Sequence, residues 1–238
     1  MDLAPHQYDA TPAPEVVEPA RDERALMGPL VNHLARHIGS PSVLVRDTCS
    51  RATPVDLLIV PPSTRHPYHT VVSCGMSELA MPAPAGAEAY RHAELLIVLS
   101  PDWPIDSATE GRPSAAWPLE VLQRIARYVL QERVWLFYMQ TVPNGHPPRP
   151  YCTKTRFSGA IIGVPVLFGR DFPEVRRPHR PPIQIYSVIP LYPEELEWKL
   201  LHGPGDLLER LEDDRITEHL RPRRTPVVGW RRYIPFAR

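Results

Sequence analysis

Two apolar runs near the middle of the chain, Val55–Val60 and Leu95–Leu99, hardly alternate with polar residues. Such runs are typical of strands that are covered on both faces, as at the centre of a sheet with helices on either side. A third run, Tyr68–Cys74, lies between them and is followed by Gly75. We therefore expect three strands here, and we expect the rest of the domain to be organised around residues 55–103.

Apolar residues at helical spacing predict helices before and after this stretch. In the first helix, apolar residues from Leu26 to Ile38 fall four apart, Gly39 follows as a stop, and Pro29 suits a first turn. The other helices are expected from Pro118 to Glu132, from Pro193 to Gly203, and over Leu207–Leu211 with Asp206 as its cap.

Further strands are predicted where β-branched and aromatic residues gather. They are Val43–Thr48, Val134–Thr141, a bent or bulged pair within Phe157–Phe168, and Ile183–Pro190, whereas the Pro- and Arg-rich residues 172–182 are expected to form a mobile loop. This order of elements predicts an α+β single domain with an α/β/α-like arrangement, in which a mixed β-sheet is flanked by helices on both faces.

Composition sets the two ends of the chain apart from this domain, which we expect to span residues 22–220. Of the 238 residues, 31 are proline, and residues 1–21 form a Pro-rich segment with little to bury. We expect that segment to be disordered. Residues 221–238 contain six arginines and no acid, with Trp230, Tyr233 and Phe236 among them. They form a basic aromatic C-terminal tail.

Charge and cysteine content narrow the classes of partner. The 27 basic and 27 acidic residues balance, which argues against a general binder of nucleic acid or of membrane surfaces. No apolar run reaches the ~18 residues of a transmembrane helix, and the N-terminus lacks the features of a signal peptide. Cys49, Cys74 and Cys152 show no CxxC spacing, so we expect a reduced, cytoplasmic protein.

Gly75-Met76-Ser77, directly after a predicted strand, raises the question of a catalytic serine. The nucleophile elbow of α/β-hydrolases requires a glycine two residues after the serine, and this chain has Leu79 there. A structural interpretation is favoured, in which Gly75 permits a tight backbone, Met76 fills the core and Ser77 caps a neighbouring group. We expect no catalytic residue.

Histidines provide the other candidate chemistry. His33 and His37 lie four apart on a predicted helix, but the glutamate of an HExxH motif is missing. His66 and His69 flank a turn without further ligands nearby, so no metal and no cofactor is expected. A hydrolase or metal enzyme would require His66, His69, Ser77 and Asp102 to converge in one pocket.

Two groups of acidic residues and one cysteine complete the candidates. Glu194 and Glu195 are adjacent, which suits charge at a helix N-terminus rather than paired acid–base catalysis. Asp102, beside Trp103, follows a central strand, where ligands bind in many sheets; a turn-forming aspartate is the alternative. Cys74 has no neighbour that would activate a thiol, and we expect it to act as a small buried residue.

Several separated motifs resemble the Suppressor of fused family. They are Gly75-Met76-Ser77 with Met81, Glu94-Leu95 after Ala93, Asp102-Trp103, and the segment from Ile189 to Leu196 that includes Tyr192, Glu194 and Glu195. The resemblance covers residues 43–215 and identifies residues 22–220 as a Suppressor of fused-like domain. It assigns Gly75, Met76, Ser77, Met81, Asp102, Trp103, Tyr192, Glu194 and Glu195 as family-motif or partner-binding residues.

The resemblance implies a non-enzymatic protein-binding module. Animal members bind transcription factors of Hedgehog signalling and carry a second, C-terminal domain, for which this chain is too short. The shorter bacterial members imply an immunity-type protein that binds and neutralises a toxin of a polymorphic toxin system. A regulatory binder of another cytosolic protein and a small-molecule hydrolase or metal enzyme built on the Gly75–Ser77 loop are the alternatives. The sequence sets no oligomeric state.

Overall fold

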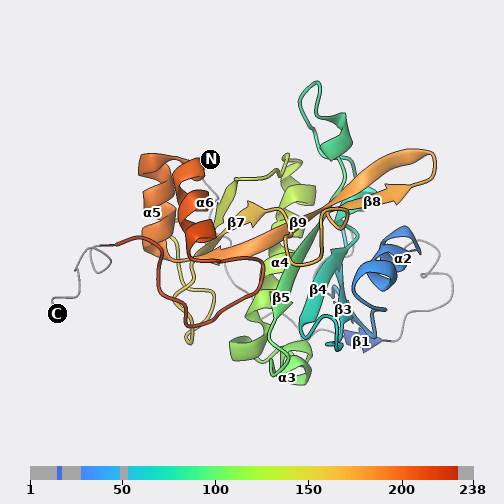
Figure 1. Cartoon of the computed structure of the whole chain (residues 1–238), viewed down its shortest axis with the longest axis horizontal. Coiled ribbons are helices and arrows are strands. Elements are labelled where there is room, and N and C mark those ends of the chain that lie inside the picture. Colours follow the sequence, from blue (N-terminus) through green and yellow to red (C-terminus); the bar gives the residue numbers. More distant parts are fainter. Residues whose placement is uncertain (1–14, 18–27, 49–52, 230–238) are drawn as a thin grey trace.

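A single mixed β-sheet forms the centre of the molecule (Figure 1). The structure is a computed structural model, and it describes residues 15–17, 28–48 and 53–229. The strand order is β1-β2-β3-β4-β5-β9-β7-β6, and β8 pairs with β9 beside this path. The strands are β1 (Glu15–Val17), β2 (Val43–Arg46), β3 (Asp56–Val60), β4 (His69–Cys74), β5 (Ala93–Leu99), β6 (Thr141–Pro143), β7 (Gly159–Gly163), β8 (Glu174–Arg177) and β9 (Arg180–Leu191).

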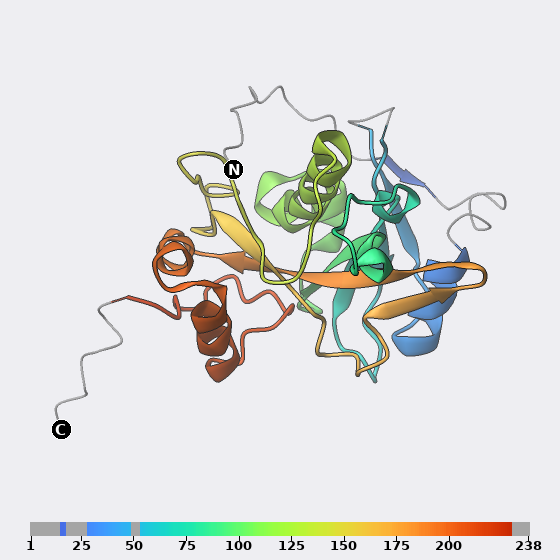
Figure 2. The same cartoon turned by 90° about the horizontal axis from the view of Figure 1, so that it is seen from above.

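Helices lie on both faces of this sheet, as the sequence predicts. The helices are α2 (Gly28–His37), α3 (Ile105–Thr109), α4 (Pro113–Glu132), α5 (Pro193–His202) and α6 (Pro204–Asp213), with 3₁₀ turns η1 (Met76–Glu78) and η2 (Glu88–Tyr90). α4 packs on one face of the sheet and α2 packs on the other face. Figure 2 shows the two helices on opposite sides of the strands. The predicted α+β fold is therefore confirmed.

Alternation along the central strands explains how one sheet supports two cores. Leu57 and Ile59 of β3 pack in the core beneath α4, whereas Leu58 and Val60 pack in the core beneath α2. All seven residues of β5 are buried, which confirms that the apolar runs mark the sheet centre. A third, smaller core joins α5 and α6 to β7 and the end of β9.

The only parallel pair among the described strands joins β5 to β9, and it is short. β5 residues 93–96 pair with β9 residues 184–187, after which β9 continues along β7. Residues 218–220, which we call the C-terminal segment, occupy the position beside β5 that β9 leaves. The Val98 amide donates to the Glu218 carbonyl (3.0 Å), and the Leu220 amide donates to the Val98 carbonyl (2.8 Å). The C-terminal segment thus completes the hydrogen bonding of β5.

Three predicted strands or loops differ from the structure. The strand predicted over Val134–Thr141 is wrong: residues 134–140 form a loop in which Met139 adopts a left-handed backbone (φ 69°). Residues 172–182 form most of the β8–β9 hairpin instead of a loop, since Pro181 and Pro182 fall where the β8–β9 register is irregular. In the stretch 157–168, one strand (β7) replaces the predicted pair.

Two helix boundaries also differ. α4 begins at Pro113, five residues before the predicted start, so Pro118 lies inside the helix. α6 begins at Pro204, and Asp206 is not its cap: its carboxylate accepts hydrogen bonds from Trp198 Nε1 (2.5 Å) and Arg210 Nε (2.8 Å). In both cases a proline supplies the first helical turn and sets the start earlier.

Candidate functional site

The buried carboxylate of Glu94 lies at the centre of the first family motif. Glu94 is the second residue of β5, and its side chain has no solvent exposure. Its Oε1 accepts hydrogen bonds from the backbone amides of Gly75 (3.0 Å) and Ser77 (2.9 Å), and its Oε2 accepts one from Ser73 Oγ (2.5 Å). One side chain therefore fixes the end of β4 and the η1 turn that follows it.

Burial dominates the electrostatics of this cluster. It raises the pKa of Glu94, and the hydrogen bonds from Ser73, Ser77 and Gly75 oppose that rise. Burial and the nearby Glu94 carboxylate also raise the pKa of the Cys74 thiol well above its usual value, so this thiol stays protonated and unreactive. His92 holds the far side of the turn, with Nδ1 2.7 Å from the Ser77 carbonyl.

Each residue of Gly75-Met76-Ser77 has a structural role. Gly75 adopts φ +124°, and a Cβ there would lie 2.6 Å from the Pro54 carbonyl oxygen, so no other residue fits without a backbone shift. Met76 is fully buried in the α4 core, and Met81 is buried beside it, with its Sδ accepting the Leu136 amide (3.4 Å). The predicted packing role of Met76 is confirmed.

The second family motif surrounds another buried carboxylate, Glu195 in the first turn of α5. Its side chain is fully buried and accepts hydrogen bonds from the Tyr192 amide (2.9 Å) and the Val227 amide (2.9 Å). Arg224 contacts both carboxylate oxygens through Nη1 (2.5 Å) and Nη2 (2.6 Å). The geometry is a bidentate, buried ion pair.

Arg224 also joins this motif to an aromatic stack. Its guanidinium lies over the rings of Tyr192 (4.8 Å) and Phe157 (5.3 Å), which stack on each other at 4.4 Å. The Tyr192 hydroxyl donates to the Arg224 carbonyl (2.5 Å). Residues 224–227, at the start of the predicted tail, are thus bound to the domain, while residues 230–238 lie outside the described residues.

The remaining motif residues are more accessible to solvent. Asp102 is exposed in the turn after β5, and a hydrogen bond with the Ser100 side chain lowers the pKa of its carboxyl. Trp103 is half-buried and donates from Nε1 to the Ala115 carbonyl (3.1 Å). Glu194 forms an ion pair with Arg156 (2.8 Å) near the surface. Of the nine motif residues, Asp102 and Glu194 are the charged ones that a partner can reach.

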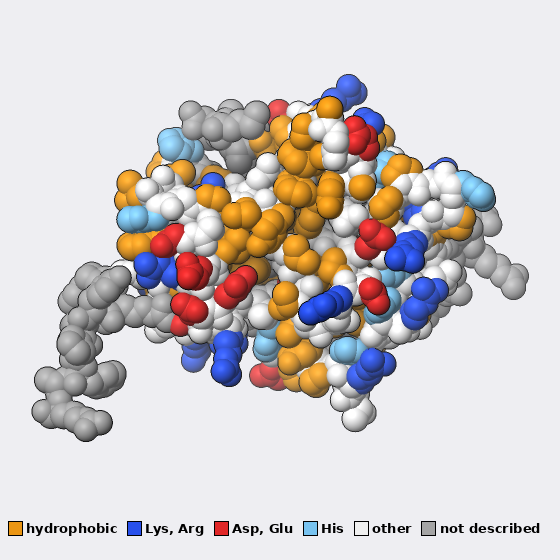
Figure 3. Space-filling view, turned by 45° about the horizontal axis from the view of Figure 1, so that its top comes forward, with side chains coloured by type: hydrophobic (Ala, Val, Ile, Leu, Met, Phe, Trp, Pro, Cys, Tyr) orange, Lys and Arg blue, Asp and Glu red, His pale blue; other side chains and the backbone are white. Residues whose placement is uncertain are grey.

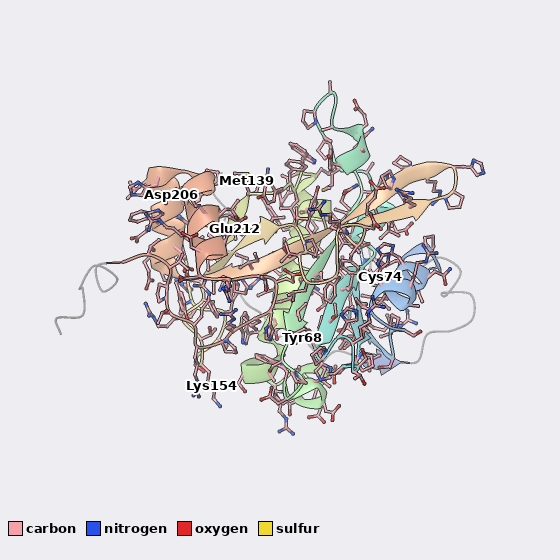
Figure 4. The ribbon with its side chains drawn as sticks, in the orientation of Figure 1. Tyr68, Cys74, Met139, Lys154, Asp206 and Glu212 are labelled. Carbon is pink, nitrogen blue, oxygen red and sulfur yellow. The ribbon has the colours of Figure 1, made fainter. Side chains whose placement is uncertain are left out.

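The set of residues required for a hydrolase does not converge. His69 pairs with Leu99, so it lies at the β5 end that leads to Asp102. Ser77 follows the other end of β4, beside Glu94 at the start of β5; Figure 4 shows Tyr68 and Cys74 at these two ends. Six strand residues separate the two ends by roughly 17–20 Å. The pocket that the hydrolase alternative requires is therefore not formed.

Packing also accounts for the first pair of histidines. His33 lies in the core with Nε2 2.9 Å from the Phe172 carbonyl, and the rings of His33 and His37 lie 4.4 Å apart. Burial lowers the pKa of His33. Within residues 28–48 and 53–229, no group of three or more His, Cys, Asp or Glu side chains is arranged to hold a metal ion. None of the helices in the described part of the chain has the length and apolar character needed to cross a membrane.

Comparison with known proteins agrees with this arrangement of motifs. The family model for Suppressor of fused protein (SUFU) matches residues 51–225. The chain belongs to the Suppressor of fused family. A search against curated protein sequences finds no match.

Solved structures of this family share the fold. A putative SUFU homolog from Neisseria gonorrhoeae is 16% identical, with a TM-score of 0.63 over 87% of this chain and 98% of its own. The Sufu–Fu complex gives 16% identity and a TM-score of 0.59 over 84% and 91%. Drosophila Suppressor of Fused gives 15% identity and a TM-score of 0.56; the match covers 83% of this chain and half of the fly protein.

Two residues that organise the motifs were not identified as key from the sequence. Glu94 carries a usable signal, because a single acid within an otherwise apolar buried strand needs hydrogen-bond donors close by. Arg224 carries no such signal. It is one of six arginines in residues 221–238, and only the fold brings it to Glu195.

Replacing Gly75 by alanine tests the constraint on the η1 turn. We expect Gly75→Ala to reduce the free energy of unfolding by about 2–4 kcal/mol, because a positive φ and a backbone clash act together. Gly86→Ala is the matched control, since Gly86 also has a positive φ (+87°) but nothing lies within 4 Å of its Cβ position. Urea unfolding of both variants provides the measurement, and equal losses would contradict the proposed clash.

The raised pKa of Glu94 predicts a pH-dependent stability. A carboxyl whose folded pKa is above its ordinary value of 4.5 stabilises the fold at low pH and loses that contribution as the pH rises through the folded pKa. The difference in unfolding free energy between the wild type and Glu94→Gln should therefore fall as pH rises above 4.5. Chemical denaturation of both proteins over about pH 4–8 tests this. A difference that rises with pH would refute it.

Breaking the Glu195–Arg224 pair should destabilise the protein strongly. In Arg224→Met, a fully buried carboxylate loses its cation, and we expect a loss of about 3–5 kcal/mol. Arg156→Met removes the near-surface pair with Glu194 and should cost under about 1 kcal/mol. Adding Glu195→Gln to Arg224→Met should recover part of the loss, as measured by thermal and urea unfolding. A double variant no more stable than Arg224→Met would contradict the role of uncompensated charge.

Proposed function

We propose that this chain is a protein-binding module of immunity type, which binds a toxin in the cytoplasm and neutralises it. Membership in the Suppressor of fused family carries the proposal, because the match covers residues 51–225. One relative of similar fold was solved as a complex of Sufu with Fu, so the fold supports protein binding in at least that case. Neutralisation then requires only that the bound partner be blocked.

The distribution of polar groups supports binding over catalysis. The motif residues Met76, Ser77, Met81, Tyr192 and Glu195 are buried and engaged in contacts that shape the fold. Ser77 lies at the opposite end of the central strands from His69 and Asp102, so these residues offer no shared site for a substrate. Asp102 and Glu194 are the motif residues that we assign as partner contacts, since both carboxylates reach the surface.

A regulatory binder of another cytosolic protein uses the same chemistry and differs only in its partner. A toxin partner has an activity of its own that falls when the complex forms, whereas a regulated partner changes activity or location without being toxic. A toxin gene beside the gene for this chain would favour the immunity role. The experiment must therefore measure the partner's activity as well as its binding.

Capture followed by reconstitution tests the proposal. Tagged full-length chain and a version ending at Gly229, which keeps the Arg224 and Val227 contacts, are used to capture partners from the native lysate. The captured protein is then expressed in a test host with and without this chain. We expect growth arrest by the partner alone and recovery on co-expression, with equimolar suppression of its activity in vitro.

The two versions separate the domain from the last residues. Equal capture by both places the interface on the domain, and capture by the full-length chain alone places it on residues 230–238. A captured partner without toxicity would support the regulatory alternative. If no captured protein binds the purified chain directly, the proposed function is overturned.

A further inference from the structure

An apolar surface lies over one face of the sheet, at the loop between α4 and β6. We call it the aromatic ledge and define it as Tyr90 with the half-buried residues Trp135, Phe137, Tyr138 and Met139. Trp135 and Phe137 stack at 4.7 Å, and Tyr90 contacts Phe137 edge-on at 5.1 Å. Figure 3 shows a continuous apolar band on this side of the molecule. Aromatic residues and methionine are the types enriched at the centre of protein interfaces.

The ledge is also held in place rather than loosely attached. The Leu136 amide donates to Met81 Sδ, the Met139 amide donates to the Ile162 carbonyl (2.9 Å), and Phe137 lies 6.2 Å from the Tyr186 ring. Two buried polar atoms at its base, Trp135 Nε1 and Tyr186 Oη, have no partner within the described residues. A rigid aromatic surface loses little conformational entropy when it is covered.

Opposite charges border the ledge on its two sides. Figures 1 and 2 both place α5 and α6 on one side of the 134–140 loop and the β8–β9 hairpin on the other. The exposed residues Glu209, Glu212 and Asp213 make the α6 side acidic. On the hairpin side, Arg176 and Arg180 are exposed; Glu174 pairs with Arg176 (3.3 Å), and the excess of arginine makes that border basic. Both borders belong to one rigid fold.

We propose that the aromatic ledge is a dimer interface, and that its occupant is a second copy of this chain. A half-turn about an axis that lies in the interface and runs between the two borders places each acidic border against the basic border of the other copy. The apolar centres then meet, as in an isologous two-fold interface. An unrelated partner would have to supply both charges in the right order, whereas a second copy carries them already.

The oligomeric state of the full chain tests this directly. Sedimentation velocity or light scattering over a concentration series should show a shift from 27.0 kDa to twice that mass. Phe137→Asp should abolish the shift, because it buries a charge at the apolar centre. Ala35→Asp is the matched control, since Ala35 is exposed on α2, which packs on the opposite face of the sheet, and it should leave the dimer intact.

Charge exchange distinguishes self-association from other uses of the ledge. Arg176→Glu/Arg180→Glu makes both borders acidic, and Glu209→Arg/Glu212→Arg makes both basic. Each variant alone should be monomeric, and an equimolar mixture should form a dimer.

Three results would overturn the proposal. They are a wild type that stays monomeric at every concentration, a Phe137→Asp variant that still dimerises, and a mixture of the charge variants that stays monomeric. If the wild type is monomeric and the Phe137→Asp variant no longer binds a captured partner, the ledge binds that partner instead. Circular dichroism of every variant checks that it is folded.

Discussion

Buried carboxylates that accept backbone hydrogen bonds determine how this domain is held together. Glu94 fixes the turn after β4, and Glu195 fixes residues 224–227 against α5. Glu218 follows the same principle, since its Oε1 accepts the amides of Val166 and Leu167, both at 2.8 Å. Removing a carboxylate from water is costly, so each position is stable only while its donors stay in place. The loops around the sheet are therefore specified by polar contacts within an apolar core.

This principle changes how the family motifs are understood. A motif that is recognisable in sequence invites the assumption that its residues bind or react. Here Gly75 is required by a close backbone contact, and Tyr192 is required by stacking on Phe157 and by a hydrogen bond to the Arg224 carbonyl. Such residues preserve a fold on which different surfaces can be carried. The function of the protein must then be sought at the two accessible motif carboxylates, Asp102 and Glu194, and on surfaces that the motifs do not mark, such as the aromatic ledge.

Much of the fold follows from the sequence because burial leaves a clear pattern. The runs that form β3 and β5 are apolar on both faces. α5 begins at Pro193, as predicted, and α2 begins at Gly28, one residue before Pro29. The strand predicted over Val134–Thr141 is wrong because the aromatic residues there have high strand propensity, yet they pack across the sheet instead of pairing within it. The sequence predicts most of β9, as Ile183–Pro190, but not β8 or the start of β9, because prolines argue against strands and a register irregularity accommodates them. Of the candidate site, the motif residues were identified, but Arg224 was not, since long-range contacts leave no local pattern.

The position of the C-terminal segment beside β5 has a consequence for the order of folding. β5 is made early in translation, but the backbone groups of Val98 find their partners only in residues 218–220, and Glu195 gains its cation only from residue 224. A nascent chain therefore cannot complete β5 until residue 220 has emerged, and burial of Glu195 before residue 224 is available would leave its carboxylate without a countercharge. Folding to the final state consequently waits for residue 224: termination before residue 218 would leave β5 without its neighbour, and termination between residues 220 and 224 would leave Glu195 without its cation.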